Sequence, residues 1–401
     1  MVSPTKSLFY DALFSAGKWA SRNRNGLFRG AVIFMVLLAV PRLTYQLWRL
    51  LVDTGSNGAL DLKMFSYWTA LWFWDEPLIL HNLLPATYPL LWPLTGWLSF
   101  EASRWLWLLL YIISFFWLFS IIKSGAALRE KKELIFAALF LIAIYPTSII
   151  IGNGQLTLFI IPAVLAAVLL GQGRPSAGRE AAMTLLLLFS TIKLPLSAPF
   201  FLVALISERA WRPVALAVLG YILLTLLAVH FRSEGLLESI ELWIRDASHL
   251  ASQDGFGNVH KWLGSAGLPE FILPASLALL AALAVWLYMN RKADIWIALG
   301  VTAIVARLWT YHRLYDDLLI IIPVVALFRI FSSGGLTPRE RAIAGALLFI
   351  SWLALLSLGF FLRLEPPVGT IFRTGTVAVW LSLLAFLVYY TYRSKKEKLP
   401  G

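Results

Sequence analysis

Cysteine is absent from the 401 residues, and histidine occurs only five times. The absence of cysteine excludes disulfide bonds, thiolate nucleophiles and cysteine-ligated metal ions. The histidines show neither an HxH nor an HExxH spacing, so no metal site is predicted. The sequence also lacks a P-loop, a GxSxG motif and a dinucleotide-binding fingerprint. Chemistry on soluble nucleotide sugars is therefore unsupported, and no cofactor is expected.

Charged residues are scarce as well. They make up 14% of the chain, against about 25% in soluble domains, while 59% of the residues are hydrophobic and the mean hydropathy is +0.76. Apolar stretches of about 18 to 22 residues recur between short polar connections, and each could cross a hydrocarbon core of roughly 30 Å. The sequence thus predicts an all-α, polytopic transmembrane protein.

The net charge of +12 could indicate a nucleic-acid-binding protein, but the basic residues lie beside the hydrophobic segments, as the positive-inside rule requires. We therefore expect no nucleic-acid partner. Basic residues at both ends of the chain place both termini in the cytoplasm, and the absence of an organelle-targeting signal favours the plasma membrane. Two cytoplasmic termini require an even number of crossings, and about twelve satisfy every basic connection. The expected spans cover residues 29–50, 104–122, 133–151, 156–171, 180–192, 194–207, 211–231, 269–290, 294–310, 317–331, 342–362 and 376–392.

This topology places the remaining connections on the non-cytoplasmic face. They are a first outer loop at residues 51–103, a second at 232–268, and short connections at 152–155, 191–195, 311–317 and 363–375. Within the first loop, residues 86–100 are apolar but short and contain Pro89 and Pro93, so we expect a re-entrant or interfacial segment. Because no internal repeat is present, residues 1–401 are predicted to form one membrane domain.

Among the acidic residues of the first outer loop, Asp61 is the strongest candidate for a catalytic role. It lies in the run Leu60-Asp61-Leu62, within a segment rich in aromatic residues. A carboxylate beside an apolar wall has a raised pKa, which suits it to accept a proton from a hydroxyl group. The alternative is that it merely solvates a loop, as we expect for Asp75 and Glu76.

Lys193 interrupts the apolar stretch from Leu185 to Leu205. An ionised side chain at membrane depth costs roughly 2.5–3.5 kcal/mol on insertion scales, so it normally faces a cavity or a partner. A lipid phosphate would be a natural partner. The alternative is that the lysine extends its side chain to an interface.

Two connections carry amide and imidazole side chains. Asn153 and Gln155 belong to a glycine-containing turn that opens a span, where amide and backbone groups can donate hydrogen bonds to an anion. Any tight turn would use the same residues. Asn258 and His260 lie between glycine and aromatic residues, as a sugar contact would, although ordinary loop chemistry explains them nearly as well.

The densest polar cluster lies between two late hydrophobic segments. It contains Arg307, His312, Arg313 and Asp316. These groups could bind a charged substrate, or their charges could cancel in a structural ion-pair network.

The features follow one another in a recognisable order. They are Asp61, Tyr88-Pro89 before a broken hydrophobic segment, Gly154-Gln155 between two spans, Lys193-Leu194-Pro195, Gly257-Asn258, and His312 with Asp316. This series, which covers most of the chain, resembles the GT-C glycosyltransferases, in particular the polyprenyl-phosphate-mannose-dependent α-mannosyltransferase-like family. The sequence departs from the family pattern at Leu90, where proline is usual, and at Thr157, where asparagine often stands.

The resemblance implies a GT-C fold and a hexose transfer with inversion, from a polyprenyl-phosphate sugar to a lipid or glycan acceptor on the outer face. It implies that Asp61 is the general base. Lys193 would stabilise the departing phosphate, with help from Arg307 and Arg313. The side chains expected to contact the sugar or the acceptor are Tyr88, Trp92, Asn153, Gln155, Asn258, His260, His312 and Asp316.

Two other functions remain open. A transporter or flippase for a lipid-linked substrate would also use broken helices and charges within the membrane. It should carry repeats related across the membrane, which the sequence lacks, and the polar clusters lie on one predicted face, which favours an enzyme. A noncatalytic membrane scaffold explains the hydrophobic segments but gives no reason for Lys193.

Overall fold

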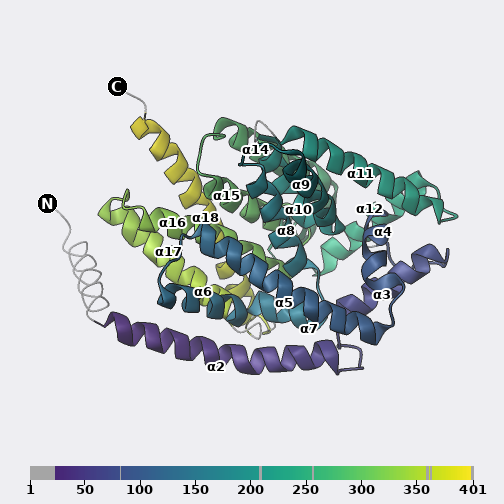
Figure 1. Cartoon of the computed structure of the whole chain (residues 1–401), viewed down its shortest axis with the longest axis horizontal. Coiled ribbons are helices and arrows are strands. Elements are labelled where there is room, and N and C mark those ends of the chain that lie inside the picture. Colours follow the sequence, from purple (N-terminus) through teal and green to yellow (C-terminus); the bar gives the residue numbers. More distant parts are fainter. Residues whose placement is uncertain are drawn as a thin grey trace.

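The computed structural model describes residues 23–81, 83–206, 210–254, 257–357, 361 and 364–398. The basic segment before residue 23, which supports the predicted topology, lies outside these residues, as does residue 363 of the last expected connection. The described part of the chain is helical and contains no β-strand (Figure 1). Its elements are α2 (Arg24–Leu51), α3 (Leu60–Phe73), α4 (Thr87–Leu91), η1 (Trp92–Gly96), α5 (Phe100–Gly125), α6 (Lys131–Ala143), α7 (Tyr145–Asn153), α8 (Thr157–Leu170), α9 (Ala177–Ser190), η2 (Thr191–Lys193), α10 (Leu194–Ile206), α11 (Trp211–His230), α12 (Leu236–Asp254), α13 (Val259–Ser265), η3 (Pro269–Phe271), α14 (Ile272–Met289), α15 (Ile295–Leu308), η4 (Leu314–Ile320), α16 (Ile321–Ser332), α17 (Pro338–Leu356) and α18 (Val368–Lys398).

Several helices are long and apolar enough to cross a membrane. Among the described residues these are Asn25–Leu51, Phe100–Gly125, Ala177–Ile206, Trp211–His230, Pro269–Met289 and Val368–Lys396, and the bent pair α6 and α7 adds a seventh candidate. Large apolar side chains such as Leu37 on α2 and Leu223 on α11 are 68% and 56% exposed, as contact with lipid requires. A polytopic, all-α membrane protein is thus confirmed, while the number of twelve spans stays a prediction.

The stretch Ala177–Ile206 is long enough for one span, but it cannot be straight. In a straight helix Ile206 would lie roughly 33 Å beyond Thr184, and the chain from Ile206 to Pro213 could return by at most about 24 Å. The Thr184 hydroxyl nevertheless lies 3.5 Å from the carbonyl oxygen of Pro213. The chain therefore turns back between α9 and α10, at the short 3₁₀ segment η2. This agrees with the connection expected at residues 191–195.

Arg42 compensates the break between α6 and α7. Pro146 lies in the first turn of α7, and Ile144 before it is extended with ψ 142°, so carbonyl groups at the end of α6 lose their helical partners. The Arg42 guanidinium donates to the carbonyl oxygen of Ala143 at 2.7 Å and, on the other side, to that of Leu356 at 3.0 Å. One arginine on α2 thus caps the ends of both α6 and α17.

The two outer loops are largely helical. Residues 86–100, expected to be re-entrant or interfacial, form α4 and the π-helical turn η1, which are both too short to span a membrane. The second outer loop contains α12 and α13, which were not expected. Figure 1 shows α3, α4 and α12 at one end of the molecule.

The opposite end gathers several basic connections. Arg329 on α16 donates to the carbonyl oxygen of Gly125 at 2.5 Å and pairs with Asp294 at 2.7 Å. Lys395 on α18 donates to the carbonyl oxygen of Met289 at 2.5 Å. These contacts bring the ends of α5, α14, α16 and α18 together, and Figure 1 shows the first turns of α2 and the last turns of α18 toward this end. Which side of the membrane the end faces stays a prediction.

Candidate active site

The first outer loop is held against the second by aromatic and charged side chains. The Trp72 indole donates to the carbonyl oxygen of Ala228 at 2.9 Å, and its ring stacks on Tyr88 with centroids 4.0 Å apart. The Arg232 guanidinium lies over the other side of the cluster, 5.3 Å from the centroid of the Trp72 ring. Further along the loops, His81 contacts Asp246 through its backbone N–H at 2.8 Å. These contacts fix α3, and with it Asp61, relative to the spans.

Asp61 lies in the first turn of α3 and is 8% exposed. The side-chain amides of Asn153 and Gln155 lie close enough to its carboxyl group to lower its pKa. Burial raises the pKa of Asp61, and Arg313, Lys193 and the two amides oppose that rise. Its Oδ2 atom is buried and has no hydrogen-bond partner among the described residues. Asp61 thus combines an ionisable group with an oxygen whose hydrogen-bonding capacity no described residue satisfies.

The turn between α7 and α8 delivers these amides. Gly154 has φ +73°, and a Cβ there would lie only 2.4 Å from the Cβ of Leu62, so the turn touches α3 directly. Trp107 on α5 donates to the carbonyl oxygen of Gly154 at 2.9 Å. The Gln155 Oε1 atom accepts from the backbone N–H of Leu156 at 2.8 Å, which leaves its amide NH₂ to donate toward Asp61.

Lys193 lies at the bend between α9 and α10 and has partners from two other helical segments. Its Nζ atom is 2.9 Å from Thr157 Oγ1 and 2.5 Å from Asp316 Oδ1. The ammonium group also lies 4.6 Å from the centroid of the Tyr315 ring. Its side chain is 18% exposed. The lysine is therefore paired within the protein and does not extend to an interface.

His312 completes this group from the connection before α16. Its Nδ1 atom lies 3.0 Å from Asp316 Oδ2, and its Nε2 atom is buried without a hydrogen-bond partner among the described residues. Burial lowers the pKa of His312, against the effect of Asp316, so the imidazole is held neutral. Burial alone would raise the pKa of Asp316, but Lys193 and His312 hold it well below its usual range. The cluster thus presents an unpaired imidazole nitrogen beside a firmly ionised carboxylate.

Arg307 is part of a second buried ion pair. It pairs with Asp317, which also accepts a hydrogen bond from Tyr145 at the start of α7. None of the three side chains is more than 1% exposed. Arg313 is placed differently: its Nε atom donates to the Tyr311 hydroxyl at 2.5 Å, and its charge lowers the pKa of Asp61. Of the two arginines expected to help with a phosphate, Arg313 is the one whose charge is seen to act on Asp61, whereas Arg307 is paired with Asp317.

The second outer loop contributes His260 through a chain of hydrogen bonds. Ser276 on α14 donates to the carbonyl oxygen of Trp309 at 2.7 Å, so its oxygen must accept from His260 Nε2, which lies 2.9 Å away. His260 Nδ1 is then an acceptor, and it is buried without a partner among the described residues. Burial lowers the pKa of His260 to about 4, with His312 adding to the effect, so the ring stays neutral.

The other three residues expected to contact the sugar or the acceptor differ in their surroundings. Asn258 caps α13 by accepting from the backbone N–H of Lys261 at 2.9 Å, and its amide nitrogen is buried without a partner in the described part of the chain. Tyr88 is fully buried in its stack with Trp72, whereas Trp92 is 43% exposed. The structure therefore brings Asp61, Asn153, Gln155, Lys193, His312, Arg313 and Asp316 together, with His260 beside them.

Sequence reasoning missed several residues of the site. Thr157, noted only as a departure from the family pattern, bonds both Lys193 and Asp316. Tyr145 and Ser276 gave no signal in the sequence. No group of three or more potential metal ligands occurs among the residues that the structure describes.

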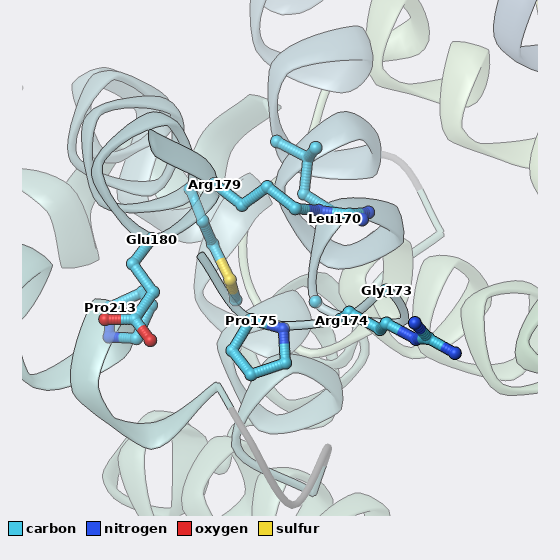
Figure 2. Close-up of a pocket in the computed structure, with 9 residues that line it drawn as sticks. Leu170, Gly173, Arg174, Pro175, Arg179, Glu180 and Pro213 are labelled. Atoms are coloured by element: carbon cyan, nitrogen blue, oxygen red, sulfur yellow. The ribbon is translucent and has the colours of Figure 1, made fainter. Parts of the chain in front are cut away.

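A small pocket at the other end of α8 does not belong to this site (Figure 2). Its volume is about 20 Å³, enough for roughly one water molecule. It is lined by Leu170, Gly171, Gly173, Arg174, Pro175, Arg179, Glu180, Met183 and Pro213. Figure 2 shows Arg174 and Arg179 on either side of this pocket, which is too small for a sugar.

Comparison with known proteins identifies the family. The model of glycosyltransferase family 87 matches residues 85–333, which include Lys193 and His312 but begin after Asp61. The comparisons with curated proteins and with solved structures gave no match. Because the matched segment covers more than half of the chain, this membrane protein belongs to glycosyltransferase family 87.

Proposed function

We propose that the protein transfers a hexose, mannose in the first instance, from a polyprenyl-phosphate sugar to a hydroxyl group of a lipid or glycan acceptor. The transfer takes place on the outer face of the plasma membrane and inverts the anomeric centre. Family membership supports a glycosyl transfer as such. The donor, the sugar and the stereochemistry belong to the proposal.

The observation that carries the proposal is the environment of Asp61. The carboxyl group is buried, its pKa is raised by burial, and its Oδ2 atom has no hydrogen-bond partner among the described residues. Such a group accepts a proton efficiently because its pKa moves toward the pH at which it works. A carboxylate that only solvated a loop would be exposed, and Asp61 is 8% exposed.

The reaction follows from these positions. The oxygen of the acceptor hydroxyl attacks the anomeric carbon and forms a bond to it. As this bond forms, Asp61 takes the proton of the hydroxyl. The bond between that carbon and the phosphate oxygen breaks, and the electron pair leaves with the polyprenyl phosphate. One sugar–oxygen bond forms and one breaks, and the proton remains on Asp61 until it passes to water. Attack from the face opposite the leaving group inverts the anomeric centre.

The leaving group gains one negative charge during this step, from a phosphodiester to a phosphomonoester. Lys193 and Arg313 are the cations we assign to that charge, with Arg307 as a more remote helper. Lys193 is bound to Asp316 and Thr157 at 2.5 and 2.9 Å, so a donor phosphate must replace part of these contacts. The exchange of one anion for another keeps the buried ammonium group paired.

The sugar and acceptor contacts follow from unpaired polar atoms. His312 Nε2 and His260 Nδ1 are acceptors for hydroxyl groups, and the Asn258 amide is a donor. Asn153, Gln155 and Asp316 border the same group, and Tyr88 and Trp92 are assigned to the wall of the pocket. A hydroxyl-rich ligand suits this set of neutral acceptors better than an anionic sugar would.

The test is transfer of radiolabelled mannose from polyprenyl-phosphate mannose into a membrane lipid extract by the purified protein. We expect transfer by the wild type and its loss in Asp61→Asn, which preserves the shape and removes the base. Because a base works only when ionised, wild-type activity should fall as the pH drops through the raised pKa of Asp61. Movement of the donor lipid across proteoliposome bilayers without transfer would instead support a flippase.

A further inference from the structure

Arg49 touches the site through Asn153 and lies on α2, far from it in sequence. We propose that Arg49 is a positioning residue that fixes the orientation of the Asn153 amide, so that its NH₂ group, and not its oxygen, faces Asp61. The inference rests on the proposed role of Asp61 as general base. It adds to that role a residue on the first span, outside the segment matched by the family model.

The contacts of Arg49 are specific. Its Nη2 atom donates to Asn153 Oδ1 at 2.8 Å and to the carbonyl oxygen of Asn57 at 2.6 Å. Its Nη1 atom donates to Gln46 Oε1 at 2.9 Å. One guanidinium therefore joins α2, the end of α7 and the connection that leads into α3.

The chemistry of the two groups decides which way the amide points. A guanidinium only donates hydrogen bonds, so the group that Asn153 turns toward Arg49 must be its oxygen. The nitrogen then points away from Arg49, and Asn153 lies close enough to Asp61 to lower the pKa of its carboxyl group, as an amide donor would. An amide turned the other way would bring its oxygen against a carboxylate, which is repulsive. Arg49 therefore selects the orientation that favours ionised Asp61.

The packing around Asn153 holds this arrangement in place. A Cβ on Gly152 would lie 1.7 Å from Gln46 Oε1, so α7 approaches α2 as closely as glycine permits. On the other side, a Cβ on Gly154 would lie 2.4 Å from Leu62. These two close contacts hold the backbone of Asn153 in place. Arg49 therefore acts on the Asn153 side chain alone and sets the torsion angle of its amide.

The experiment measures the pKa of Asp61 directly. Infrared titration of the protein in lipid nanodiscs follows the carboxyl C=O stretch, and Asp61→Asn identifies the band. We compare wild type with Arg49→Gln, Asn153→Ala and the double variant, and include Arg49→Lys in case Arg49→Gln does not fold. Lys63→Gln is the matched control, because it removes a positive charge from α3, two residues from Asp61, without touching Asn153. The Lys63 ammonium group donates to the carbonyl oxygen of Gly55 at 3.0 Å.

A lost hydrogen bond to the ionised form raises the pKa of the acid. Arg49→Gln and Asn153→Ala should each raise the pKa of Asp61 by about half to one unit, with no further rise in the double variant. Arg49→Lys should lie between wild type and Arg49→Gln. Where transfer is measurable, the acid limb of kcat/KM should move upward by the same amount.

Three results would overturn the proposal: an unchanged pKa in Arg49→Gln or Asn153→Ala, additive shifts in the double variant, or an equal shift in Lys63→Gln. The infrared readout does not depend on the sugar donor. A wild type that transfers no sugar would therefore contradict the proposed function and leave the role of Arg49 measurable.

Discussion

Lys193 lies in an apolar stretch, where an isolated charge would be costly, and Asp316 lies 2.5 Å away to offset it. The same balance recurs in the neighbouring pair of Arg307 and Asp317, which is almost fully buried. Arg313 and Asp61 supply one further charge of each sign. The resting site is therefore electrically balanced, and an incoming phosphate has to compete with Asp316 for Lys193.

Separate replacements of Lys193 and Asp316 distinguish folding from phosphate binding. Lys193→Met leaves Asp316 buried and unpaired, which should lower the free energy of unfolding by about 3–5 kcal/mol and abolish transfer. The double variant Lys193→Met/Asp316→Asn removes both charges, so thermal stability should return close to that of wild type, as intrinsic fluorescence in detergent would report. Transfer should stay lost in the double variant. Recovered transfer there would contradict the role of Lys193 at the phosphate.

The sequence pointed to site residues where an ionisable side chain stands beside an apolar segment, because such side chains are rare within membranes. Asp61, Lys193 and His312 stand out because ionisable groups beside apolar segments need a reason. Arg49 did not stand out, since a basic residue at the end of a span has an ordinary explanation at the interface. Its partner Asn153 is 104 positions away in the sequence. A contact of that kind follows from the packing of α2 on α7, which no local pattern encodes.

At the scale of elements, α7 connects the two halves of the site. Its first residue, Tyr145, donates a hydrogen bond to Asp317, and its last residue, Asn153, lies near enough to Asp61 to lower its pKa. Arg42 caps the break before α7, and Arg49 binds its end. The face of α2 that carries these arginines therefore sets the position of α7. Through α7 it also sets the distance between the carboxylates of Asp61 and Asp317.

Arg42, which caps the break between α6 and α7, can be replaced without changing a residue of the site. Arg42→Ala leaves the carbonyl groups of Ala143 and Leu356 without their donor in a medium that offers no replacement. We expect a loss of stability on the order of 3 kcal/mol, measured as unfolding in detergent or bicelles. Arg42→Lys can reach one carbonyl group at a time and should lose less. Equal stability of wild type and Arg42→Ala would show that the break needs no cap.

The sequence predicted the elements unevenly. Spans with uninterrupted apolar runs, such as α5 and α11, are long helices, and the short segments on either side of Lys193 correctly pointed to a turn there. The helices α12 and α13 of the second outer loop were missed. In α12, Leu236, Ile240 and Trp243 recur at helical spacing, but the segment is too polar for a span and was assigned to a connection. These two helices are held by contacts with α14 and with the first outer loop. One of these contacts joins His260 on α13 to Ser276 on α14.

At the scale of the whole molecule, the polar site lies at one end of the helices and the basic connections at the other. Thr157 begins α8 at the site, whereas Leu170 ends α8 beside Arg174 and Arg179. The turn at η2 returns the chain to that basic end before α11. An even number of crossings stays a prediction, which fits the first turns of α2 and the last turns of α18 lying toward the same end (Figure 1). The proposed outer location of the site depends on which side of the membrane that end faces.

The absence of cysteine allows a direct test of this arrangement, because the natural chain is already a cysteine-free background. Single replacements Ser56→Cys in the first outer loop, and Gln172→Cys, Arg212→Cys and Ser333→Cys at the basic end, lie at exposed positions. In intact cells a membrane-impermeant maleimide should label only Ser56→Cys, and all four after permeabilisation. If Ala177–Ile206 were one straight span, Gln172→Cys and Arg212→Cys would label on opposite sides. Labelling of Ser333→Cys but not Ser56→Cys in intact cells would place the site in the cytoplasm, where a polyprenyl-phosphate sugar presented at the outer face could not reach it.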